Sequence, residues 1–184
     1  MPALKIHLGC GKRQIPGFVH CDRVAFPHVD HVIDIRNLEI FGDDSAELIY
    51  ACQVLEYFDR EEVGIVLAEW RRVLRPGGTL RLSVPNFAFI ARMYAAGLKL
   101  DWFLGTLYGK IDDGSNGYVY HKTTYDEESL RRVLTLAGFD NPRLWRWQDV
   151  EHSNVDDFSQ AYFPHMEKER GILVNLNMEA NKPI

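Results

Sequence analysis

The feature that most constrains the fold is a glycine turn between two short apolar runs, in the sequence KIHLGCGKRQIPGFVHCD over residues 5–22. Ile6 and Leu8 predict a buried strand, Gly9-Cys10-Gly11 a turn, and Phe18 to Cys21 a second strand ending on Asp22. Glycines let backbone N–H groups approach a ligand closely, and an acid at a strand tip can accept hydrogen bonds from ribose hydroxyls. The stretch therefore predicts a nucleotide-type pocket.

Strand-like and helix-like segments alternate along the rest of the chain. Strands are expected at residues 31–35, 46–51, 79–84, 142–147 and 172–180, and helices over residues 59–74 and 126–137. Arg75-Pro76-Gly77-Gly78 is expected to stop the first helix, and Asp126 to cap the second. This alternation predicts a Rossmann-like α/β fold, with a mostly parallel sheet covered by helices on both faces. The alternating pattern of the last strand favours an antiparallel partner.

The predicted strands end on residues suited to a ligand site. Ligands of such sheets bind at the carboxyl ends of the strands. Gly9, Asp22, Asp34, Cys52 and Pro85 all fall at these predicted ends. We therefore expect five segments to converge on one crevice.

Composition limits the domain count and the classes of partner. The 184 residues are 46% hydrophobic, which predicts one domain over residues 1–184. The formal net charge is −5 and the pI is about 5.8, which argues against nucleic acid or an anionic membrane as partner. Without a membrane-spanning apolar run or the apolar core of a signal peptide, the chain is expected to be cytoplasmic. Three cysteines without a CxxC pair fit reduced thiols.

Two segments depart from the alternating pattern. Residues 86–125 are rich in aromatic residues and glycine and follow a predicted strand end, so we expect a lid-like insertion. Residues 148–170 form a second irregular segment, and the aromatic residues between 145 and 166 suggest a homodimer surface.

Several motifs together are similar to one enzyme family. The sequence contains HLGCG, an acid at Asp22, a second at Asp34, LIYACQVLEYF, EWRRVLRPGGTLRLSVPN and YDEESLRRVLTLAGF. In this order they resemble the class I S-adenosylmethionine-dependent methyltransferases, especially a small bacterial group with a shortened first helix. The resemblance implies a seven-stranded sheet with the last strand antiparallel, S-adenosylmethionine as cofactor, and a small-molecule or glycan-type methyl acceptor.

The same resemblance assigns roles to individual residues. It implies that the turn Gly9, Cys10, Gly11 holds the methionine part of the cofactor through backbone donors, and that Asp22 binds the ribose hydroxyls. Asp34 and Ile35 would flank the adenine. Residues 52–55, including Cys52, Gln53 and Leu55, would line the sulfonium side. The chain has Gln53 and Tyr57 where this group often has histidines, and residues 11–18 are too few for a crossover helix.

His121 is the expected general base, because it follows the lid-like insertion and could return to the crevice. A packed or hydrogen-bonded structural histidine is the alternative. Asp22 and Asp34 could likewise cap turns, and Glu56 could orient its loop or cap the following helix. Cys10 and Cys52 fit buried packing positions better than nucleophiles.

Other functional classes fit less well. A nicotinamide enzyme would need GxGxxG and a P-loop would need GK[ST], and neither motif is present. A metal site built on His20, Cys21, His28, Asp30 and His31 has no second paired motif, so no metal is expected. A catalytically degenerate scaffold that acts through cofactor binding or protein interaction remains the alternative to an enzyme.

Overall fold

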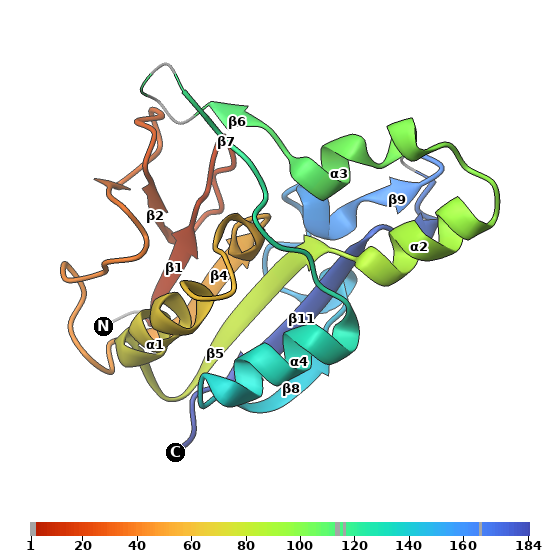
Figure 1. Cartoon of the computed structure of the whole chain (residues 1–184). Coiled ribbons are helices and arrows are strands. Elements are labelled where there is room, and N and C mark those ends of the chain that lie inside the picture. The colour runs from red at the N-terminus through yellow and green to blue at the C-terminus, as the bar shows by residue number, and fades with distance from the viewer. Residues whose placement is uncertain (1–2, 113–114, 116, 166) are drawn as a thin grey trace.

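The computed structural model describes residues 3–112, 115, 117–165 and 167–184. A seven-stranded sheet forms the centre of the molecule, in the order β3-β2-β1-β4-β5-β11-β8 (Figure 1). Its strands are β1 (Leu4–Leu8), β2 (Val19–Asp22), β3 (His31–Val32), β4 (Ala46–Cys52), β5 (Leu74–Pro85), β8 (Asp140–Leu144) and β11 (Asn175–Asn181).

Strand direction follows the prediction. Neighbouring strands from β3 to β5 pair in parallel, whereas β11 pairs antiparallel with both β5 and β8. The seven-stranded, mostly parallel sheet with its last strand antiparallel is therefore confirmed. The final strand is shorter than expected, because β10 (Ile172–Leu173) pairs separately with β9 (Tyr162–Phe163).

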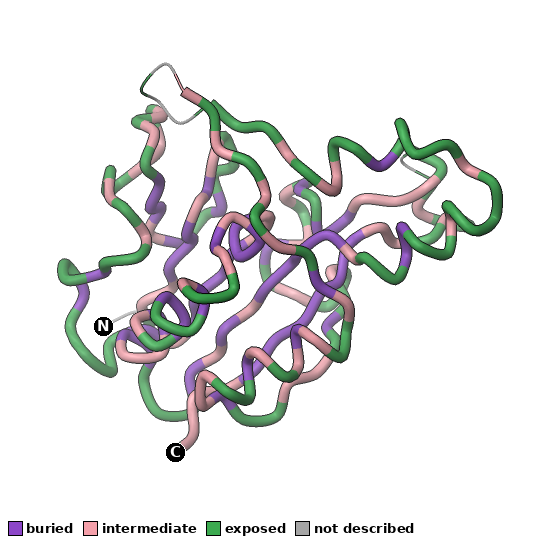
Figure 2. Tube along the Cα trace, viewed as in Figure 1, coloured by how far each residue is buried: buried purple, intermediate pink, exposed green. Residues whose placement is uncertain are grey.

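One face of the sheet is covered by helices. α1 (Val63–Val73) and α4 (Glu127–Leu136) pack side by side on this face (Figure 1). Val66, Leu67 and Trp70 from α1 and Leu130 and Leu134 from α4 are buried in its core, as the helical spacing predicts. Buried residues run along the central strands beneath them (Figure 2). The predicted cap also forms: the Asp126 side chain accepts a hydrogen bond from the backbone N–H of Ser129 (2.8 Å).

The other face is covered differently from expectation. Here an irregular segment, residues 145–160, packs on the sheet with only two short 3-10 turns, η3 (Trp147–Asp149) and η4 (Phe158–Gln160). The side chains that the strands turn to this face include His7, Tyr50 and Asn177, all nearly or fully buried. Buried polar side chains need hydrogen-bonding partners, and the irregular segment supplies partners for the Tyr50 hydroxyl and for Asn177 Nδ2, which donates to the Ser159 carbonyl (2.9 Å). For example, the Tyr50 hydroxyl lies 2.6 Å from Asp157 Oδ2.

The connector between β1 and β2 contains no helix, as its length predicts. Ile15 and Phe18 bury their side chains against Tyr50 and Trp145 instead. The Ile15 backbone N–H donates to His20 Nε2 (2.8 Å), and His20 Nδ1 lies 3.2 Å from Asp30 Oδ2. His20 therefore fixes the connector and the loop after β2 in place of a crossover helix.

Two local boundaries differ from the sequence-based expectation. α1 ends at Val73 and β5 begins at Leu74, so residues 75–78 loop out of the ladder as a bulge. Ala46 pairs with Leu74 but Leu48 already pairs with Thr79. The Arg75-Pro76-Gly77-Gly78 turn is thus built inside β5 and does not separate two elements.

The segment expected as a lid-like insertion leaves the sheet at the end of β5. It contains α2 (Phe87–Ala95), η2 (Leu100–Trp102), α3 (Leu104–Tyr108) and the short hairpin of β6 (Ile111–Asp112) and β7 (Tyr118–Val119). The hairpin lies above the carboxyl ends of β1 and β2 (Figure 1).

In the described ranges of the chain, no helix is long and apolar enough to cross a bilayer.

Candidate active site

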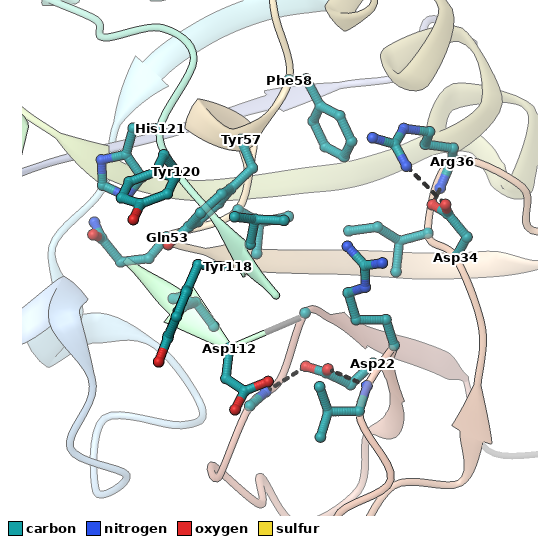
Figure 3. A pocket seen from close by; sticks show the side chains of 18 of the residues that line it. Asp22, Asp34, Arg36, Gln53, Tyr57, Phe58, Asp112, Tyr118, Tyr120 and His121 are labelled. Atoms are coloured by element: carbon teal, nitrogen blue, oxygen red, sulfur yellow. Dashed lines mark hydrogen bonds and ion pairs between the residues drawn. The ribbon is translucent and has the colours of Figure 1, made fainter. Parts of the chain in front are cut away.

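A cleft of about 940 Å³ opens at the carboxyl ends of β1, β2 and β4. One wall comes from the strand ends and the loops that follow them. The opposite wall comes from β6 and from residues 118–125, which begin with β7 and which we call the strap. Gln53, Tyr57 and His121 stand on one side of this space, Asp34 and Arg36 on the other, and Asp22 at its foot (Figure 3). The predicted convergence of strand ends therefore holds for four of the five segments, and Pro85 does not line the cleft.

The glycine turn is held by its own hydrogen bonds. The backbone N–H groups of Gly9 and Cys10 donate to the Cys21 carbonyl (2.8 and 3.3 Å), so they already have protein partners. Gly11 N–H donates to Asp22 Oδ2 (2.8 Å). The turn was expected to hold a ligand through these backbone donors, whereas the structure uses them to join the turn to β2.

Asp22 is the link between the turn and the loop after β2. Its second oxygen accepts a hydrogen bond from Val24 N–H (2.9 Å). The side chain is 8% exposed and that exposed part faces the cleft. A carboxylate offers about four acceptor positions, so two backbone donors leave room for ligand hydroxyls.

Asp34 and Ile35 lie at the far end of the cleft, after β3. Asp34 Oδ2 pairs with Arg36 Nη1 (2.7 Å), and Oδ1 accepts from Arg36 N–H (3.0 Å). Partial burial tends to raise the pKa of the Asp34 carboxyl, but the hydrogen bonds and charge of Arg36 outweigh it and lower the pKa. Asp34 is therefore an ionised acceptor at neutral pH.

The loop after β4 brings a side-chain donor to the cleft. Gln53 adopts a positive φ of 57°, and its backbone N–H donates to the Ser83 carbonyl (2.8 Å). Its Nε2 is buried and lacks a hydrogen-bond partner within the described residues. A ligand acceptor or an ordered water in the adjoining cleft would supply the missing partner of this buried donor.

Three residues expected at the cofactor do not line the cleft. Cys10 is 3% exposed and Leu55 fully buried, and both pack into the protein. Cys52 lies on the same side of β4 as Leu48 and Tyr50, so it packs against the second face of the sheet. Burial raises the pKa of the Cys10 thiol to about 12, which supports a packing role.

His121 lies in the strap, two residues after β7, and lines the cleft. Its side chain is only 4% exposed. Nδ1 lies 3.1 Å from the Thr106 carbonyl, and Nε2 lies 3.9 Å from Glu56 Oε1. Both ring nitrogens thus point towards protein groups, and burial lowers the pKa of the imidazole.

Sequence reasoning missed much of the wall near Asp34. The loop after Asp22 contributes Arg23, Val24 and Phe26, and the Arg36 guanidinium lies 5.4 Å from the centre of the Phe58 ring. No motif marks these residues, because a loop's path depends on what it packs against. Asp112 was also missed, whereas the aromatic richness of residues 86–125 did indicate Tyr118 and Tyr120.

Two of the residues weighed as a metal site, His20 and Asp30, are paired with each other. His20 bonds Ile15 and Asp30 as described above. In the part of the chain that the structure describes, no group of three or more His, Cys, Asp or Glu residues is arranged to hold a metal ion.

Comparisons with known proteins agree with this geometry. A family model described as a methyltransferase domain matches residues 8–82. No curated protein matches the sequence.

Solved structures match over nearly the whole chain. A chain of the complex between the Haloferax volcanii Trm112 methyltransferase activator and a methyltransferase is 16% identical, with a TM-score of 0.57, covering 100% of this chain and 86% of that one. Burkholderia thailandensis 1,6-didemethyltoxoflavin-N1-methyltransferase, with bound 1,6-didemethyltoxoflavin and S-adenosylhomocysteine, is 15% identical, with a TM-score of 0.56 and coverages of 100% and 72%. A methyltransferase from Methanosarcina mazei is 17% identical, with a TM-score of 0.56 and coverages of 98% and 92%.

The fold is therefore that of the class I S-adenosylmethionine-dependent methyltransferases. Residues 8–82, which carry the glycine turn, both acids and the loop after β4, also have the sequence pattern of a methyltransferase domain. The resemblance to methyltransferases inferred from the motifs is confirmed, and the small bacterial group stays a prediction.

Proposed function

We propose that the chain is an S-adenosylmethionine-dependent methyltransferase that transfers a methyl group to a small-molecule or glycan-type acceptor by in-line displacement. The observation that carries this proposal is the cleft, because Gly11, Asp22, Asp34 and Gln53 from four separate segments line one space. The carboxyl groups of Asp22 and Asp34 and the unpaired amide of Gln53 suit a long, polar, partly cationic ligand.

The described residues offer a fitting cradle for this cofactor. Asp22 would accept the ribose hydroxyls, and Asp34 with Ile35 would border the adenine. A Cβ added at Gly11 would meet no atom within 4 Å, so the cleft is open at this side of the turn. Gln53 Nε2 would face the amino-acid portion or the acceptor. The cofactor, when bound, supplies an electrophilic methyl group on a sulfonium.

The contribution expected of the chain's own residues is mainly positioning. Holding donor and acceptor in a reactive geometry can supply roughly 7–11 kcal/mol, whereas a general base contributes about 10²- to 10⁴-fold, roughly 3–5 kcal/mol. The strap and the loop after β4 would orient the acceptor and exclude water. The general-base role of His121 stays a prediction, and its two ring nitrogens face Thr106 and Glu56.

The strap wall favours an acceptor with a ring. Tyr57, Tyr118 and Tyr120 line this side, with Asp112 and Lys122 among them. Aromatic faces bind sugars and planar rings, and interspersed charges orient polar substituents. A cytoplasmic location, the single-domain organisation and a homodimer stay predictions from the sequence.

Titration calorimetry with S-adenosylmethionine and S-adenosylhomocysteine tests the proposal. The wild-type protein should bind both, and Asp22→Asn should weaken binding by roughly 10- to 100-fold, since hydrogen bonds to a charged group contribute about 1.5–3 kcal/mol. Asp43→Asn is the matched control, because Asp43 pairs with Arg72 outside the cleft. Absence of binding heat in the wild type would favour a degenerate scaffold that has lost its ligand.

Transfer itself needs a second assay. Cofactor carrying an isotopically labelled methyl group should pass label into small-molecule or glycan fractions of a cell extract, and Asp22→Asn should reduce this. Label that appears only in nucleic acid or protein would contradict the proposed acceptor class.

A further inference from the structure

Glu56 is a fully buried acid beside the cleft. It lies in η1 (Leu55–Tyr57), is 0% exposed, and neither carboxyl oxygen has a hydrogen-bond partner among the residues described. A charged carboxylate without a partner is costly to bury. Burial accordingly raises the pKa of Glu56 to about 8, so the side chain carries a proton at neutral pH.

The His121 ring is clamped so that one nitrogen faces Glu56. The Thr106 carbonyl can only accept, so Nδ1 carries a hydrogen and donates it across 3.1 Å. The ring lies directly on Gly109, where an added Cβ would come within 2.5 Å of Nε2, and its centre is 4.7 Å from that of Tyr57. In the neutral imidazole, Nε2 therefore presents a lone pair, 3.9 Å from Glu56 Oε1.

The backbone holds the same two segments together. The N–H groups of Lys122 and Thr123 both donate to the Glu56 carbonyl (2.8 and 3.2 Å). Strap and η1 thus meet at the Glu56 main-chain carbonyl, and the Glu56 side chain lies beside the His121 ring. Three residues that line the cleft come from this region: Tyr57 lies in η1, Gln53 lies just before η1, and His121 lies in the strap.

We propose that Glu56 is a positioning residue: its carboxyl proton is donated to His121 Nε2, and this Glu56–His121 pair fixes the strap against η1 and thereby shapes the acceptor side of the cleft. The effect on ligand binding rests on the proposed function, whereas the shared proton does not. Ordinary N···O hydrogen bonds span roughly 2.7–3.2 Å, so a movement of less than about 1.5 Å from the observed separation forms the bond.

Among the residues that the structure describes, none near Glu56 supplies a fixed positive charge. The titratable side chains facing it are Tyr57, Tyr125 and Cys52 besides His121, and burial raises the pKa of all three. The Lys122 ammonium is bound outside to Glu62 Oε2 (2.6 Å). Loss of the Glu56 proton would leave a buried, uncompensated anion, so the pair should release the strap at alkaline pH.

Two spectroscopic measurements test the shared proton without any ligand. Infrared difference spectra of the wild type should show a protonated-carboxyl band at pH 7 that titrates near pH 8, and Glu56→Gln should lack it. In ¹⁵N spectra, His121 should be a neutral ring protonated at Nδ1, with Nε2 accepting a hydrogen bond. Glu62→Gln is the matched control and should leave both signals unchanged. A band that is missing in the wild type, or retained in Glu56→Gln, would overturn the pair.

Calorimetry from pH 6.5 to 9 then tests the effect on the cleft. In the wild type, S-adenosylhomocysteine affinity should fall about tenfold between pH 7 and pH 9, because only the protein with a protonated Glu56 is expected to bind it. Glu56→Gln should bind with little change over this range, because its amide is neutral throughout and can still donate to Nε2. An equal alkaline loss in Glu56→Gln would refute the positioning role. Absence of binding in every protein at every pH would instead count against the proposed function and leave the infrared result standing.

Discussion

At the scale of single residues, Asp22 both holds the turn and borders the cleft, two positions that the sequence did not separate. It was expected to bind a ligand or to cap a turn. In the structure its two oxygens accept from Gly11 N–H and Val24 N–H, and its exposed part still faces the cleft. The turn and the proposed ribose site therefore depend on the same carboxylate.

The two glycines of the turn should respond differently to the same substitution. Both have positive φ, 62° at Gly9 and 53° at Gly11. Only at Gly9 would a Cβ collide with a neighbour, 2.5 Å from Val54 Cγ2. Gly11→Ala should cost about 1 kcal/mol of unfolding free energy for backbone strain alone, and Gly9→Ala about 2–4 kcal/mol, because valine is stiff and cannot turn aside.

Denaturant unfolding of the single and double variants measures this difference. Val54→Ala combined with Gly9→Ala should recover part of the loss, with a coupling of about 1 kcal/mol or more, whereas combined with Gly11→Ala it should be additive. Equal costs at the two glycines would show that the Val54 contact is unimportant.

Residue-scale prediction succeeded where a position is tied to a strand end. Asp22 ends β2, Asp34 lies two residues after β3, Gln53 directly follows β4, and all three line the cleft. Their roles in binding stay predictions. Residue-scale prediction failed for Cys52, because alternation along β4 turns this side chain to the opposite face. The sequence places Cys10 and Leu55 near the ligand site. It does not indicate that their side chains are buried in the protein.

At the scale of elements, the two faces of the sheet differed in predictability. The spacing of apolar residues in α1 reports a buried stripe directly. The cover of the second face has no period, since it is an irregular segment held by individual contacts such as Tyr50 with Asp157, which are far apart in sequence.

The irregular cover should loosen independently of the helices when one of these contacts is removed. Tyr50→Phe deletes the donor to Asp157 Oδ2 and leaves a carboxylate that is 9% exposed with one fewer partner. We expect a loss of about 1–3 kcal/mol, concentrated in residues 145–160.

Hydrogen exchange measured by mass spectrometry resolves the location of this loss. Peptides covering residues 145–160 should exchange faster in Tyr50→Phe, and peptides of α1 should be nearly unchanged. Tyr94→Phe, at an exposed tyrosine, is the control. Uniformly faster exchange across the molecule would contradict an independently held cover.

At the scale of the whole molecule, the polar second face of the sheet makes the free energy of unfolding depend on pH. His7 is 2% exposed, and burial, followed by the charges of His20, His152 and His28, lowers the pKa of His7 to about 3. Burial also lowers the pKa of His152, whose ring centre lies 4.3 Å from that of Tyr50. These rings are neutral in the folded protein and line the interface between the sheet and its irregular cover.

The sign of the resulting pH dependence follows from the lowered pKa. Below about pH 6.5 the unfolded chain binds a proton at His7 that the folded chain does not, so stability falls from there down towards pH 3. At pH 5 the loss from His7 amounts to about 2 kcal/mol. His7→Phe should remove this part of the acid loss and keep the part due to His152, whereas His31→Asn, at an exposed histidine, should change nothing. Urea unfolding at pH 7, 6 and 5 measures how the free energy of unfolding changes with pH in the wild type and the two variants. If His7→Phe loses as much stability in acid as the wild type, protonation of His7 is not what destabilises the folded molecule.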